Sequence, residues 1–100
     1  MRTMPDEHLR ASDVPTEGAP LSELRAFAHT FDGYKRWGSF EQCARIANAR
    51  DHSSLDTLRT CLFFEVRRWH HFGGDPDPRA EEYWRTLTTK IRHLAQERGS

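Results

Sequence analysis

One apolar segment, from Leu55 to Phe72, limits what this chain can fold into, because the rest of the sequence is polar. Ser53 and Ser54 precede it, and Asp56 follows Ser53 by three residues, a spacing that predicts a helix N-cap. Two glycines follow the segment and favour the end of a helix. The sequence therefore predicts one helix of about five turns between these signals.

Apolar residues occur on more than one side of this predicted helix. Its main stripe follows helical spacing, whereas Phe63 and Phe64 fall outside that stripe. A helix that is apolar on most sides is either central in its domain or shared with a partner. We expect Phe63 and Phe64 to be an exposed apolar pair at an interface, and we expect a homodimer. The main stripe consists of Leu55, Leu58, Leu62, Val66 and Trp69.

An acidic residue, Glu65, falls within the apolar side of the same helix. A buried carboxylate must be paired, protonated or at the edge of a cleft, because an isolated buried charge is costly. Two interpretations stay open. Glu65 is either structural, in an ion pair with an arginine on a neighbouring helix or reaching solvent, or it shares a pocket with Arg68, Trp69, His70 and His71. Adjacent histidines point in different directions on a helix, so we expect no metal site here.

Three further segments, at 21–31, 39–50 and 78–97, carry apolar residues at helical spacing, and no segment alternates as a strand would. The sequence therefore predicts an all-α fold: a compact bundle of about four helices, with a long antiparallel hairpin of the last two. Residues 1–20 contain three prolines and no periodicity, which predicts a flexible N-terminal arm. Residues 21–98 are expected to form the helical domain.

Local signals predict where these helices begin and end. Asp32 and Gly33 are expected to end the first helix. Ser39 is expected to cap the second, and Asp77 the last. Phe40 is expected on the inner face of the second helix, because it shares the helical spacing of that segment's other apolar residues.

The connector at 34–38 is rich in aromatic and cationic residues. Tyr34 and Trp37 are candidate interface residues, since tyrosine, tryptophan and arginine are typical anchors of protein interfaces. The alternative is that Trp37 folds back over a small core as a lid, which would bury a large aromatic area.

Composition narrows the classes of function. Fifteen basic and fifteen acidic residues give a formal net charge of zero, which makes nucleic acid an unlikely partner. Cys43 and Cys61 have no metal-ligand or redox spacing, and we expect reduced thiols in a cytoplasmic protein. The N-terminal twenty residues contain no apolar signal-peptide core, and no apolar run approaches the ~18 residues of a membrane span.

The sequence predicts a small cytosolic interaction or regulatory protein without catalytic activity or cofactor, which self-associates or binds a protein partner. A first alternative is a small helical enzyme or ligand binder with a site around Glu65, Arg68, His70 and His71. A second alternative is a nucleic-acid binder that contacts phosphates through the polar flank of the central helix, beside Trp37 and Trp69. That flank consists of Arg59, Arg67, Arg68 and His71.

Overall fold

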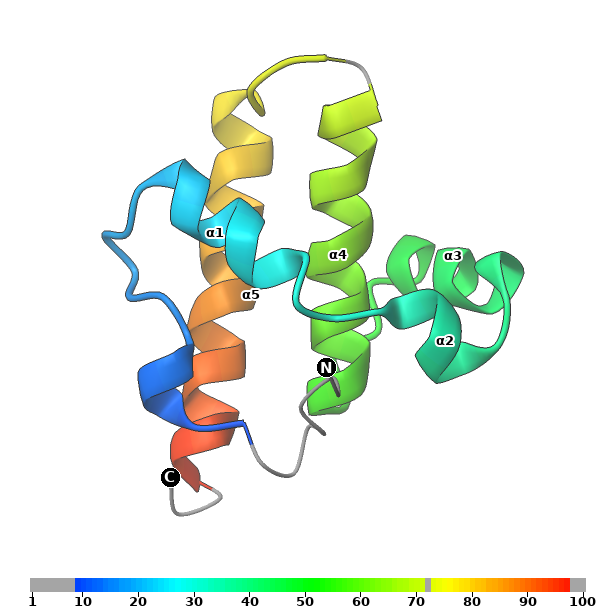
Figure 1. Cartoon of the computed structure of the whole chain (residues 1–100), viewed down its shortest axis with the longest axis horizontal. Helices are drawn as coiled ribbons and strands as arrows, with labels where there is room; N and C mark the ends of the chain where they lie inside the picture. The colour runs from blue at the N-terminus through cyan, green and yellow to red at the C-terminus, as the bar shows by residue number, and fades with distance from the viewer. Residues whose placement is uncertain (1–8, 72, 98–100) are drawn as a thin grey trace.

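The computed structural model describes residues 9–71 and 73–97, and these residues form an all-helical bundle (Figure 1). The predicted fold class is confirmed, including the antiparallel hairpin of the last two long helices. The Cα radius of gyration is 12.6 Å, close to the ~13 Å expected for a folded chain of this length. The helices are η2 (Ala11–Asp13, a 3-10 turn), α1 (Leu21–Ala28), α2 (Gly33–Trp37), α3 (Phe40–Asn48), α4 (Leu55–His71) and α5 (Pro78–Glu97).

Helix α4 is the centre of the bundle. It lies beside α5, while α1 crosses the hairpin on one side and α2 and α3 pack on the opposite flank of α4 (Figure 1). The apolar surface on several sides of α4 therefore has several neighbours, and the core forms mainly where α1, α4 and α5 meet. Its fully buried large side chains include Leu24, Leu58, Leu62, Val66, Trp84, Leu87 and Ile91.

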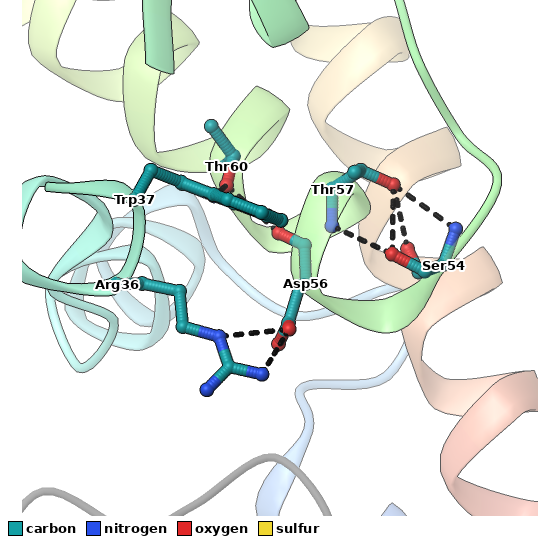
Figure 2. A network of polar contacts seen from close by, with 6 residues as sticks. All are labelled: Arg36, Trp37, Ser54, Asp56, Thr57 and Thr60. Atoms are coloured by element: carbon teal, nitrogen blue, oxygen red, sulfur yellow. Dashed lines mark hydrogen bonds and ion pairs between the residues drawn. The ribbon is translucent and has the colours of Figure 1, made fainter. Parts of the chain in front are cut away.

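Helix α4 begins at Leu55, as predicted, but Ser54 rather than Ser53 caps it. Ser54 Oγ accepts a hydrogen bond from the Thr57 N–H (3.2 Å), and the Ser54 N–H donates to Thr57 Oγ1 (3.0 Å; Figure 2). These two bonds form a reciprocal capping box. The predicted cap formed by Ser53 and Asp56 is wrong, because Asp56 instead accepts from Arg36 Nε of α2 (2.8 Å).

The segment predicted as a connector is the short helix α2. Asp32 and Gly33 begin this helix, since Asp32 Oδ1 accepts from the Lys35 N–H (3.2 Å). Their predicted role in ending the first helix is wrong, because α1 already ends at Ala28. Trp37 Nε1–H donates to Thr60 Oγ1 of α4 (2.7 Å; Figure 2), and its ring packs against the core. Trp37 thus packs over the core as the lid interpretation predicts, and its role as an interface residue stays a prediction.

The other predicted helix ends are confirmed. Ser39 Oγ accepts from the Gln42 N–H (3.1 Å) at the start of α3, and Asp77 Oδ1 accepts from the Ala80 N–H (2.8 Å) at the start of α5. After α4, Gly73 adopts a positive φ of 76°, the left-handed conformation that glycine takes without a steric penalty.

Residues 9–20, which belong to the segment predicted as an arm, pack against the bundle. Leu9 and Val14 join the core cluster. Arg85 of α5 donates to the carbonyl oxygens of Glu17 and Ala19, each at 2.7 Å. The flexibility of the arm stays a prediction, and its first eight residues lie outside the described part of the chain. Within that part, no helix is long and apolar enough to cross a membrane.

Candidate functional site

A cleft of 570 Å³ opens where α2, α3 and the C-terminal half of α4 meet. Helix α4 has 17 residues and α3 has 9, and the last turns of α4 extend beyond α3 (Figure 1). We call this site the aromatic–arginine cleft. Its lining residues are Tyr34, Phe40, Ala44, Asn48, Phe64, Arg67, Arg68, His70 and His71.

Three aromatic rings from three helices form the apolar part of the cleft. The ring centroids of Tyr34 and Phe40 lie 5.9 Å apart, those of Phe40 and Phe64 5.4 Å apart, and those of Tyr34 and Phe64 6.0 Å apart. Phe40 is 61% exposed, and among the described residues it is the large hydrophobic side chain that solvent reaches most. The three rings thus contact one another while Phe40 stays exposed to solvent.

Cationic side chains border these rings. The Arg67 guanidinium lies 5.5 Å from the Tyr34 ring centroid and 5.4 Å from that of Phe63, within the range of cation–π attraction. The Arg68 side chain is 59% exposed, and its nearest carboxylate oxygen, Glu65 Oε1, is 3.9 Å away. At that distance and exposure the ion pair is weak. The lining residues include no aspartate or glutamate, so the cleft is positively charged.

The spacing of residues on two helices explains how the sequence builds this cleft. On α3, Phe40, Ala44 and Asn48 follow one another at intervals of four and therefore share one face. The small Ala44 leaves room between the helices. On α4, Phe64 and Arg68 are likewise four residues apart, which places a ring and a guanidinium side by side.

Several predicted site residues do meet in this cleft. Arg68, His70 and His71 come together there with Phe64 and Tyr34, two of the predicted interface residues. The two histidines are exposed, and the His70 ring lies edge-on to His29, which follows α1, with centroids 6.5 Å apart.

The prediction that Phe63 and Phe64 form an exposed pair is wrong for Phe63, which is only 5% exposed. Its ring packs edge-on against Phe31 and Tyr34, with centroid distances of 6.4 and 5.2 Å. The reason is the unpredicted helix α2, which covers this flank of α4. The homodimer stays a prediction, but Phe63 no longer supports it.

Glu65 and Trp69 lie outside the cleft. Trp69 packs against the core cluster. The Glu65 side chain is 19% exposed and lies on the side of α4 that carries Cys61, where its charge adds to the effect of burial in raising the pKa of that thiol to about 11. The structure therefore does not assemble the predicted pocket of one acid, two histidines and a tryptophan wall.

Arg59 is also separated from the cleft. It is 4% exposed, and its guanidinium lies 4.6 Å from the Phe31 ring centroid and donates to Thr30 Oγ1 (3.2 Å). Arg59 is therefore buried and does not belong to the exposed arginines of the predicted phosphate-binding flank.

Phe40 is the cleft residue whose predicted position is wrong. Its helical spacing with Cys43 suggested the inner face of α3, but Cys43 is buried and Phe40 is exposed. Phe40 is the first residue of α3, and it lies on the side facing the rings of Tyr34 and Phe64 rather than the core. The sequence did contain one signal for this position, because Phe40 directly follows the N-cap residue Ser39.

A second polar cluster joins the turn after α3 to α5. Lys90 Nζ lies 3.2 Å from His52 Nδ1, and His52 Nε2 lies 3.0 Å from the Tyr83 hydroxyl. Because a lysine ammonium can only donate, Nδ1 accepts and Nε2–H donates to Tyr83. Burial lowers the pKa of His52, and the charges of Lys90 and Arg50 lower it further. This cluster connects elements of the fold, and His52 and Lys90 also line a separate pocket of 390 Å³.

The described residues contain no group of three or more histidine, cysteine, aspartate or glutamate side chains that could hold a metal ion. No protein-family model, curated protein or solved structure matches the chain.

Proposed function

We propose that the protein is a small, non-catalytic interaction protein that binds another protein through the aromatic–arginine cleft. The observation that carries this proposal is the exposed Phe40 ring, held against Tyr34 and Phe64 but covered by neither. A fully buried phenylalanine contributes about 1.5–3 kcal/mol more than an exposed one, so its exposure forgoes stability that a bound partner can supply. Aromatic residues and arginine are also enriched at the centres of interfaces.

The enzyme alternative has less support. The cleft residues include two histidines but no carboxylate, serine, threonine or cysteine that would pair with them. Nucleophilic catalysis needs an activated nucleophile next to its base, and the cleft residues supply none of these side chains. Glu65, the acid on which that alternative depended, lies on a different side of α4.

Nucleic acid is also less favoured as a partner. The formal net charge of the chain is zero, so no overall positive field attracts a polyanion. The cluster rings are tilted or perpendicular to one another, with interplanar angles of 36°, 50° and 86°. Rings in this arrangement do not form a parallel platform for successive bases.

Self-association through the cleft is the less favoured version of an interaction function. In a twofold dimer the same patch meets itself, so Arg67 and Arg68 of both copies would face one another. Like charges at close range oppose such a contact. We therefore favour a different protein as the partner. The two buried free thiols, Cys43 and Cys61, support a cytoplasmic location as part of the proposal.

The test is selection of binding peptides from a random displayed library, with the wild-type protein as bait. Phe40→Asp adds one negative charge inside the cleft, and Thr86→Asp adds the same charge on an exposed position of α5. We expect selected peptides to bind wild type and Thr86→Asp equally, and Phe40→Asp at least about tenfold more weakly. Selection that yields no peptides, or peptides that ignore Phe40→Asp, would contradict the proposal.

A further inference from the structure

We infer that the occupant of the aromatic–arginine cleft is an acidic peptide segment that carries one large apolar side chain. The inference rests on the proposed function and specifies the chemistry of the partner. Two properties of the cleft carry it: an excess of cationic side chains that lack close carboxylates, and an exposed aromatic ring next to them.

The cations of the cleft are available to an incoming carboxylate. Among the described residues, none has a carboxylate within ion-pair distance of Arg67. Arg68 has only the distant contact with Glu65, at 3.9 Å, and remains 59% exposed. A guanidinium pairs best with a carboxylate that accepts two parallel hydrogen bonds, which the present contacts of these arginines do not provide.

The aromatic cluster is suited to one apolar anchor. Phe40 and Phe64 lie with ring centroids 5.4 Å apart, and Ala44 keeps the space beside them open. The cleft volume of 570 Å³ falls within the ~300–1,000 Å³ of typical ligand sites, so it admits a few side chains rather than a whole helix face.

The spacing on α4 sets how close the two recognition elements of the partner must be. Phe64 and Arg68 are neighbours at i and i+4, and side chains in this relation lie about 5–6 Å apart at Cβ. A carboxylate and an apolar side chain must therefore lie within about one helical turn, or two residues of extended chain, of each other in the partner.

The experiment is a matrix of labelled short peptides that differ at two kinds of position. The central residue is phenylalanine or alanine, and the flanking residues are aspartate, asparagine or lysine. Binding is measured by fluorescence anisotropy with wild type, Arg68→Glu and Arg79→Glu. The last variant makes the same charge change at an exposed site in the first turn of α5. A thymidine oligonucleotide and the protein's own mass in solution complete the set.

We expect the aspartate–phenylalanine peptides to bind wild type and Arg79→Glu most tightly. Loss of the aspartates, loss of the phenylalanine, or Arg68→Glu should each weaken binding at least about tenfold, and the lysine peptides should bind Arg68→Glu better than wild type. Affinity for the acidic peptides should fall as salt is raised.

Other outcomes would overturn the inference of an acidic partner, and they can be told apart from a failure of the proposed function. Asparagine peptides that bind as tightly as aspartate peptides would remove the acidic partner while leaving a protein-binding cleft. Tighter binding of the oligonucleotide, or a dimer that Phe40→Asp dissociates, would assign the cleft to a different occupant. If no peptide of the matrix distinguishes wild type from Arg68→Glu, the inference is wrong, whatever the library selection yields.

Discussion

Arg50 adopts a left-handed backbone conformation, with φ at 52°, at the position after the end of α3 where glycine is common. The Asp51 N–H donates to the Ile46 carbonyl oxygen (3.1 Å) and closes the helix end. The Arg50 guanidinium lies 4.4 Å from the Tyr83 ring centroid. At this distance a cation–π attraction offsets part of the cost of a side chain in the left-handed conformation.

Two substitutions of Arg50 separate the backbone strain from the contact with Tyr83. Arg50→Gly and Arg50→Ala both lose the contact with Tyr83, but only alanine keeps a Cβ in the left-handed conformation, which costs about 1–2 kcal/mol. We predict that Arg50→Ala is less stable than Arg50→Gly by about 1 kcal/mol in urea unfolding. Equal stabilities of the two variants would show that the strain is released in some other way.

His52 makes stability depend on pH. Its pKa is lowered in the folded state by burial and by Lys90 and Arg50, whereas the ordinary value is 6.5. The unfolded chain therefore binds more protons in the window below 6.5, so the contribution of neutral His52 is full above that pH. It is lost as the pH falls toward the folded pKa. The negative charge of Asp51 opposes this lowering of the His52 pKa.

We predict that the free energy of unfolding of wild type decreases as the pH falls from 7 to 5, the range in which an ordinary histidine gains its proton. His52→Gln, which cannot be protonated, should show a shallower decrease over the same range. Denaturant unfolding at several pH values measures both slopes. Parallel curves for the two proteins would mean that another group controls the acid response.

At the scale of elements, the sequence predicted the long helices and missed the short one. Helices α4 and α5 are long enough for a periodic apolar pattern, and Asp77 and Gly73 mark their ends unambiguously. Helix α2 has 5 residues, too few for periodicity, and its Asp32 cap reads equally well as a helix stop. This omission had a consequence, because α2 buries Phe63.

The start of α4 offers a test of the observed cap against the predicted one. Ser54 exchanges hydrogen bonds with Thr57 across the first turn, whereas the Ser53 hydroxyl donates to Asp51 in the preceding turn (2.6 Å). We predict that Ser54→Ala lowers stability by about 1 kcal/mol and that Ser53→Ala lowers it by less. Thermal or urea unfolding of the two variants decides the point, and the opposite order would restore the predicted cap.

At the scale of the whole molecule, α4 has two different halves. Its N-terminal half packs among neighbouring helices. Its C-terminal half supplies Phe64, Arg67, Arg68, His70 and His71 to the aromatic–arginine cleft. The sequence predicted Tyr34 and Phe64 for an interface and Arg68 and the two histidines for a pocket, and the structure brings all five to one cleft. The sequence could not place Phe40 or exclude Glu65, since both depend on how α3 packs against α4.

The bound position of a partner can be located directly from the amide resonances of the nitrogen-15-labelled protein during addition of an aspartate–phenylalanine peptide. We predict that the largest shift changes occur at Tyr34, Phe40, Phe64, Arg67 and Arg68, with little change along α1 and α5. Changes centred on α1 and α5, or none at a peptide concentration that saturates binding in anisotropy, would contradict the assignment of the cleft as the binding surface.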